Sequence, residues 1–141
     1  MSYNAAFFAV HEAYFLVLKE EKGEDFALDV MRRVMERSLG KAYTTIGFTK
    51  GSTNTFVKVV GKRDKSVGLR VEFPEVSEDR MVYRFHTDPF PNLRGQVDPR
   101  RLDDTYMKFK VEFLLGKEWH YRTTKHLWNG DEFTEHVIEL K

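Results

Sequence analysis

The chain has 141 residues, of which 41% are hydrophobic and 32% charged, so it can bury one sizeable core and is not a disordered segment. Its 23 Lys and Arg residues nearly balance its 22 Asp and Glu residues, which argues against nucleic acid as a partner. Because the sequence has no cysteine, disulfides, thiol nucleophiles, CxxC zinc sites and iron–sulfur clusters are excluded. We therefore expect a single domain over residues 1–141.

The longest apolar stretch near the N-terminus, residues 5–18, is interrupted by His11 and Glu12. It is too short and too polar to span a membrane, so no membrane partner is expected. It also lacks the preceding basic region and the following cleavage site of a secretory signal. These features predict a cytoplasmic protein.

Two helices are expected at the start of the chain. Residues 4–20 are apolar on nearly all sides of a helix, which predicts burial on several faces and, in a small domain, a homodimer formed through this helix. Apolar residues at helical spacing predict a second helix from Glu24 to Leu39. Gly40 is expected to end it in the left-handed conformation.

Residues 41–54 are expected to form a loop, and the pattern then changes to one typical of strands. A β-branched run predicts a strand over residues 55–60, followed by a polar turn at 62–65. Alternation of apolar and polar residues predicts a second strand over 67–73, which Pro74 ends. A third strand is predicted over 81–87, with Met81, Tyr83 and Phe85 on one face.

Asp98 followed by Pro99 is typical of a helix start, because the carboxylate can accept a free backbone N–H and proline fits the first turn. The helix should end before Gly116. Two more strands are expected around Asn129-Gly130, a dipeptide suited to a type I′ turn. This order predicts an α+β fold with two N-terminal helices, a mostly antiparallel sheet of about five strands, and one helix between strands three and four.

The predicted two-residue turn fixes the register of the last hairpin. One face then becomes more polar toward the turn, which is typical both of a core that opens into a ligand pocket and of a hairpin that runs out into water. The pairs expected on this face are Trp119 with Leu140, Tyr121 with Ile138, Thr123 with His136, and Lys125 with Thr134.

The five histidines form none of the local spacings HxH, HxxxH or HExxH, so no metal is assigned and no cofactor is expected. His86 and Asp88 share a strand face and could hold a metal with a distant third ligand. Alternatively, Asp88 starts a turn and His86 faces water. His11 could bind haem or act as a base in a pocket, or it could be a core or interface histidine that is hydrogen-bonded to a neighbour.

The C-terminal part contains an acidic residue early in a helix, then Arg-Thr, Gly-Asp and Thr-Glu-His segments. This pattern resembles that of the L-2-amino-thiazoline-4-carboxylic acid hydrolase-like family. The resemblance implies a small α+β domain that binds a small organic ligand, with members that open a thiazoline ring. The family pattern has cysteine where this chain has Thr134, so a thiol-dependent step is impossible here. The matching residues are Asp104, Arg122-Thr123, Gly130-Asp131 and Thr134-Glu135-His136.

Our leading hypothesis is a small-molecule-binding domain with the ligand on the polar face of the last hairpin. Lys125 would suit a ligand carboxylate. One alternative is a hydrolase acting on a cyclic amidine or amide C–N bond, with His136 as general base and Lys125 or Arg122 stabilising an anionic intermediate. A second alternative is a homodimeric interaction module. The expected ligand contacts are Tyr121, Arg122, Thr123, Lys125, Thr134 and His136.

Overall fold

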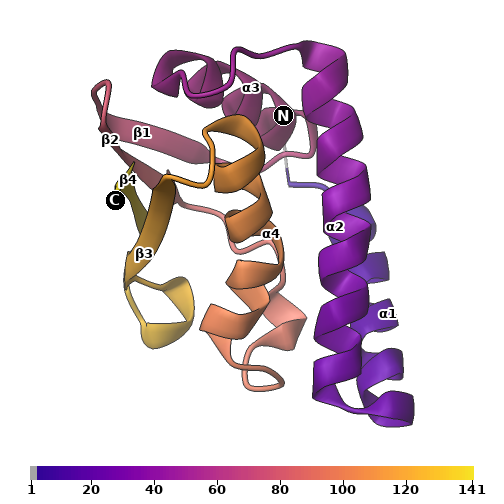
Figure 1. Ribbon diagram of the computed structural model, residues 1–141. Helices are drawn as coiled ribbons and strands as arrows, with labels where there is room; N and C mark the ends of the chain where they lie inside the picture. The colour runs from indigo at the N-terminus through magenta and orange to yellow at the C-terminus, as the bar shows by residue number, and fades with distance from the viewer. Residues whose placement is uncertain (1–2) are drawn as a thin grey trace.

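The computed structural model describes residues 3–141 and contains four α-helices and one sheet of four strands (Figure 1). The first two residues of the predicted domain lie outside the described part. The helices are α1 (Ala5–Lys22), α2 (Glu24–Ile46), α3 (Thr53–Ser66) and α4 (Pro99–Leu114). The strands are β1 (Val71–Val76), β2 (Arg80–Phe85), β3 (Trp119–Lys125) and β4 (Thr134–Leu140), with short 3₁₀ turns η1 (Pro91–Leu93) and η2 (Leu127–Asn129).

All neighbouring strands pair antiparallel, in the order β1-β2-β4-β3. The predicted α+β class is confirmed. The helix predicted between strands three and four is α4, and it lies between β2 and β3 because the first predicted strand is helical. The expected count of about five strands is wrong, since the described residues form four. In Figure 1, α4 lies between the sheet and the α1–α2 pair, and α3 lies beside β1.

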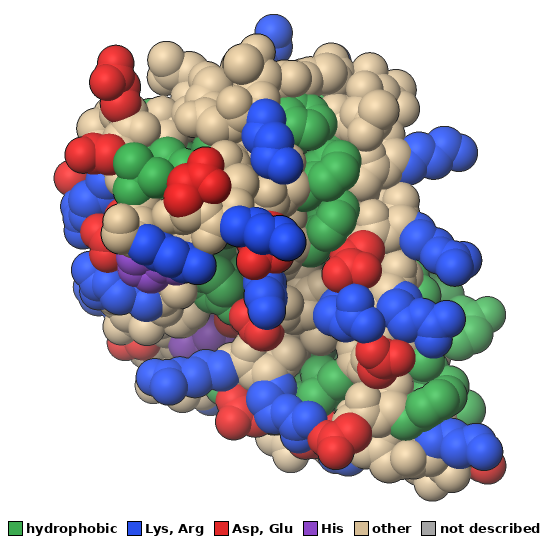
Figure 2. All heavy atoms as spheres, viewed as in Figure 1, with side chains coloured by type: hydrophobic (Ala, Val, Ile, Leu, Met, Phe, Trp, Pro, Cys, Tyr) green, Lys and Arg blue, Asp and Glu red, His purple; other side chains and the backbone are tan. Residues whose placement is uncertain are grey.

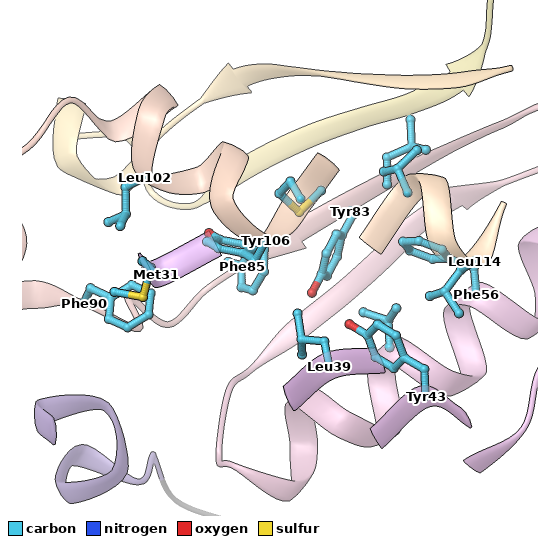
Figure 3. Packing of buried hydrophobic residues seen from close by; sticks show 14 of the residues in the cluster. Met31, Leu39, Tyr43, Phe56, Tyr83, Phe85, Phe90, Leu102, Tyr106 and Leu114 are labelled. Atoms are coloured by element: carbon cyan, nitrogen blue, oxygen red, sulfur yellow. The ribbon is translucent and has the colours of Figure 1, made fainter. Parts of the chain in front are cut away.

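Alternation in β2 directs one row of side chains against the helices. Met81, Tyr83 and Phe85 are almost completely buried, as the sequence pattern predicts. Figure 3 shows Phe85 and Tyr106 between Phe90 on one side and Tyr83 on the other. One continuous cluster of buried hydrophobic residues includes side chains from every helix and from β2, β3 and β4.

The second helix is longer than predicted, because Gly40 lies inside α2 and does not end it. A Cβ atom at Gly40 would lie 3.3 Å from Phe109 Cζ, so the missing side chain lets α2 approach α4 closely. Gly47 ends the helix instead, with a φ of 88° and its N–H donating to the Tyr43 carbonyl.

The predicted strand at 55–60 is wrong, since these residues belong to α3. Ser52 Oγ caps this helix by accepting the Thr55 N–H at 3.2 Å. Phe56, Val59 and Val60 are fully buried, at the spacing of one helix face, so packing overrides the strand preference of the β-branched residues. The loop predicted at 41–54 is correspondingly reduced to residues 47–52.

The second predicted strand is displaced along the chain, because β1 starts at Val71. The predicted end at Pro74 is also wrong, since this residue lies inside β1. It is tolerated there because the pairing of β1 with β2 shifts between Glu72 and Glu75, where a proline removes no ladder hydrogen bond.

The last hairpin keeps most of the predicted register. Trp119 pairs with Leu140, Tyr121 with Ile138, and Thr123 with His136. The two-residue turn is wrong, because η2 lies within the connection and only Gly130 takes the left-handed conformation. A register shift after Thr123 then pairs Lys125 with Glu135 in place of Thr134.

The predicted start of α4 is confirmed and can be tested. Asp98 Oδ1 accepts the Arg100 N–H at 2.8 Å. Asp98→Ala should lower the free energy of unfolding by about 1 kcal/mol, because this N–H then loses its acceptor. Asp98→Asn, which keeps the acceptor, should cost clearly less in the same urea denaturation experiment. Equal losses for the two variants would show that the carboxylate charge, and not the cap, supplies the stability.

Candidate functional site

A partly open cavity of about 60 Å³ lies where α1, α2, α3 and α4 meet the segment that follows β2. Most of its walls are apolar and many are aromatic. The rings of Phe8 and Phe90 form an edge-on pair there, with centroids 5.6 Å apart. The apolar lining residues are Phe7, Phe8, Met35, Leu39, Val67, Leu69, Phe85, Pro89 and Phe90.

A buried polar chain borders this cavity and joins three elements of the fold. Lys110, from the middle of α4, donates from Nζ to the Tyr83 hydroxyl of β2 at 3.2 Å. The Tyr83 hydroxyl in turn donates to Asp64 Oδ2 at the end of α3. All three residues are buried, and Lys110 and Asp64 line the cavity. Charged groups are rarely buried to this degree unless they are paired.

The opposite charges of Lys110 and Asp64 stabilise each other. Burial raises the pKa of the Asp64 carboxyl, and the nearby Lys110 opposes that effect. Burial lowers the pKa of the Lys110 amine, and Asp64 opposes it. The Lys110 Nζ atom also lies 5.1, 5.6 and 5.4 Å from the ring centroids of Tyr83, Phe85 and Tyr106. Three aromatic rings therefore lie around the Lys110 ammonium group. Among the described residues, this group has one hydrogen-bond acceptor, the Tyr83 hydroxyl.

Two further polar residues lie on the α1 side of the cavity. The guanidinium of Arg63, which is half-buried, lies 5.7 Å from the ring centroid of Phe7. Within residues 3–141 no carboxylate lies within ion-pair distance of it, and its one side-chain partner is Ser66 Oγ at 3.4 Å. His11 Nδ1 donates to the Phe7 carbonyl at 2.9 Å. This contact agrees with the second alternative for His11, a histidine that is hydrogen-bonded to a neighbour.

The wall formed by the segment after β2 is attached directly to α1. The buried carboxylate of Glu12 accepts the Asn92 backbone N–H at 2.7 Å and the Asn92 side-chain amide at 3.0 Å. The Tyr3 hydroxyl donates to the Pro89 carbonyl at 2.9 Å. These hydrogen bonds therefore join α1 and Tyr3 to the segment that follows β2.

A second buried polar group joins α4 to the last hairpin. His126 Nε2 donates to Asp103 Oδ2 at 3.1 Å, while His126 Nδ1 accepts the Trp128 N–H at 3.1 Å. The Tyr106 hydroxyl donates to Asp103 Oδ1 at 3.0 Å. Because both ring nitrogens of His126 are in use, this histidine–carboxylate pair holds the loop in place and has no free nitrogen to serve as a base.

Among the sequence-predicted contacts, the structure brings Tyr121, Thr123 and His136 together. His136 is fully buried, with Nδ1 3.0 Å from Thr123 Oγ1 and its ring 5.6 Å from that of Tyr121. His136 Nε2 has no hydrogen-bond partner among the described residues. His136 is not among the residues that line the cavity described above.

The other predicted contacts are separated from this group. Thr134 is buried and accepts the Leu127 N–H at 3.0 Å. Lys125 and Arg122 are exposed, and with Tyr121 and Thr123 they line open grooves beside the first turn of α4. Their role as ligand contacts, and that of His136 as a base, stays a prediction.

Sequence reasoning missed the cavity residues Lys110, Asp64 and Arg63. One signal could have found Lys110: it lies four residues after Tyr106 and four before Leu114, on the buried face of α4. A lysine on the apolar face of a helix predicts a buried hydrogen-bond acceptor or carboxylate beside it. Asp64 and Arg63 carried no such signal, because their segment has the composition of a polar turn.

The possible metal pair His86 and Asp88 is engaged in protein hydrogen bonds. His86 Nε2 lies 2.8 Å from Glu72 Oε1. Asp88 accepts the Phe90 N–H at 2.9 Å and the Trp128 indole N–H at 2.7 Å. Across residues 3–141 no three His, Asp or Glu side chains are arranged to hold a metal ion. The helices of the same range include none with the length and apolarity needed to cross a membrane.

Comparison with known proteins gives a likeness to a solved structure. No family model matches the sequence, and no curated protein matches it. The resemblance to the L-2-amino-thiazoline-4-carboxylic acid hydrolase-like family therefore stays a prediction. The structure is similar to that of the phenol-responsive sensory domain of the transcription activator PoxR, solved with phenol, at a TM-score of 0.66 and 14% identity over 98% of this chain and 74% of that chain. At this identity the likeness establishes a shared fold.

The burial of His136 makes the stability of the protein depend on pH. Burial lowers the pKa of His136 from 6.5 to about 4, so in this window the unfolded chain binds the proton more tightly. The free energy of unfolding should thus fall as the pH drops from 6.5 toward 4, by about 3 kcal/mol from this residue. Urea denaturation of His136→Asn should show a shallower loss, whereas the half-exposed His120→Gln should follow the unmutated protein. A loss as steep in His136→Asn would contradict this assignment.

Proposed function

We propose that this chain is a small-molecule-binding domain and that its ligand is a compact ring compound held in the cavity between α1, α2, α3 and α4. The observation that carries the proposal is the buried Lys110–Tyr83–Asp64 chain beside an aromatic-walled cavity. A few polar groups that converge on an apolar cavity are typical of ligand sites. The shared fold with a sensory domain that was solved with phenol supports the same class of ligand.

The size of the cavity adds a conformational requirement. An apolar cavity that binds benzene in another protein measures about 150 Å³. The cavity here, at about 60 Å³, is smaller. We therefore infer that α1 and the attached segment around Asn92 move outward when a ring enters, carrying the Glu12 hydrogen bonds with them. This movement would couple ligand binding to the outer face of α1.

We do not extend the proposal to hydrolysis. The predicted base, His136, is fully buried, and burial holds its pKa well below neutral pH. It is not among the residues that line the cavity. The Asp103–His126 pair is fully hydrogen-bonded and offers no free ring nitrogen.

We further propose that a second copy of the chain covers the outer face of α1 and α2. Seven large hydrophobic residues are exposed among the described residues, and five of these lie on this helix pair. Figure 2 shows hydrophobic side chains gathered at the lower right, over α1 and α2. Clustered exposure of this kind marks interaction surfaces. The five residues are Val10, Tyr14, Val17, Phe26 and Val34.

Blocking the cavity tests the ligand proposal. Phenol added to ¹⁵N-labelled protein should shift the amide signals of cavity residues. Ser38 is exposed at the cavity edge, so Ser38→Trp should obstruct entry and weaken binding about tenfold or more. Arg37→Trp, a neighbouring exposed position that does not line the cavity, is the matched control. Signals that shift equally in both variants, or only outside the cavity, would refute the site.

Sedimentation velocity tests the homodimer. The unmutated protein should sediment as a dimer at micromolar concentration, and Tyr14→Glu should shift it to a monomer by placing a charge in the interface. Leu140→Glu, at an exposed hydrophobic position on β4, should leave the dimer intact. A monomeric unmutated protein would rule out this part of the proposal.

A further inference from the structure

We propose that the ligand of this cavity carries one negative charge on a planar group, and that Lys110 and Arg63 bind it. A compact aromatic carboxylate fits this description. The inference rests on the proposed function, because it identifies the chemical class of ligand for the same cavity. The evidence for this inference is the set of charges and unused hydrogen-bond donors on the residues that line the cavity.

The formal charges at the cavity do not balance. Lys110 and Arg63 each contribute a positive charge, and Asp64 contributes the single carboxylate among the lining residues. The Tyr106 hydroxyl stays neutral, because burial and the Asp103 carboxylate raise its pKa well above the usual value. One positive charge is therefore left over, and a monoanionic ligand would neutralise it.

The unused hydrogen-bond donors of Lys110 and Arg63 also favour an anionic ligand. Lys110 has three N–H groups and one acceptor, the Tyr83 hydroxyl, among the described residues. Arg63 has five N–H groups, and its side-chain partner within the same range is a serine hydroxyl at 3.4 Å. The side-chain carboxylate acceptor among the lining residues is Asp64, whose Oδ2 accepts the Tyr83 hydroxyl, which leaves Oδ1 against the many N–H groups of Lys110 and Arg63. The cavity thus offers donors in excess, and a group that only accepts hydrogen bonds complements it.

Shape and solvation favour a carboxylate on a ring. The planar fork of an arginine matches a carboxylate with two parallel hydrogen bonds. The remaining walls are aromatic and aliphatic, so the rest of the ligand gains most by being apolar and flat. A phenolate shares the anionic oxygen but presents only one acceptor atom, so it should bind less tightly to two cationic residues.

Binding of four ring compounds of similar size to the full chain tests the proposal: benzoate, phenol, benzyl alcohol and benzylamine. Affinities would be measured near neutral pH by ¹⁵N NMR titration. Benzoate should bind at least about tenfold more tightly than benzyl alcohol. Benzylamine should bind most weakly, because it carries a positive charge. Phenol is neutral near this pH, because a phenolic hydroxyl ionises only at about pH 10, so it should bind about as weakly as benzyl alcohol.

Two variants assign the preference to residues. Arg63→Gln should remove most of the benzoate advantage, because it should weaken benzoate binding much more than benzyl alcohol binding. Lys62→Gln, an exposed neighbour on α3 that does not line the cavity, should keep the full advantage. Lys110→Met should also abolish the preference. If this variant fails to fold because Asp64 is left buried without its partner, Arg63→Gln still decides the question.

The outcomes separate the two proposals. If benzyl alcohol or phenol binds in the cavity as tightly as benzoate, the charge inference is overturned and the cavity remains a ligand site. An unchanged benzoate preference in Arg63→Gln also overturns the assignment to Arg63. If none of the four compounds binds, the proposed function fails together with the inference.

Discussion

The buried hydrogen-bond chain from Lys110 through Tyr83 to Asp64 is the constraint on which the rest of the structure depends. Each residue comes from a different element, so the chain fixes α3 and α4 against the centre of the sheet. Removing one partner of a buried charge pair costs about 3–5 kcal/mol, whereas an apolar replacement of the whole group is often neutral. We therefore assign this group to the proposed ligand site, because packing alone does not require it.

This constraint also explains why α1 matters for the site. The Lys110–Tyr83–Asp64 hydrogen bonds join α4, β2 and α3 on one side of the cavity, while α1 and the segment that follows β2 line the other side. The outer face of α1 carries exposed hydrophobic residues, including Val10 and Tyr14. One helix therefore has the cavity on its inner side and the proposed dimer surface on its outer side. A movement of α1 on ligand entry would be transmitted to a partner subunit.

The elements that local chemistry specifies could be predicted from the sequence. The Asp98-Pro99 start of α4 and the alternation of β2 depend on neighbouring residues alone, and both are confirmed. Residues 55–60 form a helix despite their strand preference, because tertiary packing buries one helix face. Gly40 does not end α2; its missing side chain allows a close contact with Phe109. The cavity escaped prediction because its walls come from segments far apart in the chain, from Phe7 to Lys110.

The central claim is that a ring compound occupies this cavity with its polar group at the buried lysine. A crystal structure of the protein grown with benzoate tests it most directly. The account predicts density for the ring among Phe8, Phe85 and Phe90, with a carboxylate oxygen within hydrogen-bond distance of Lys110 Nζ. Benzoate bound only in the open grooves beside α4, with the cavity closed around its own side chains, would contradict the account.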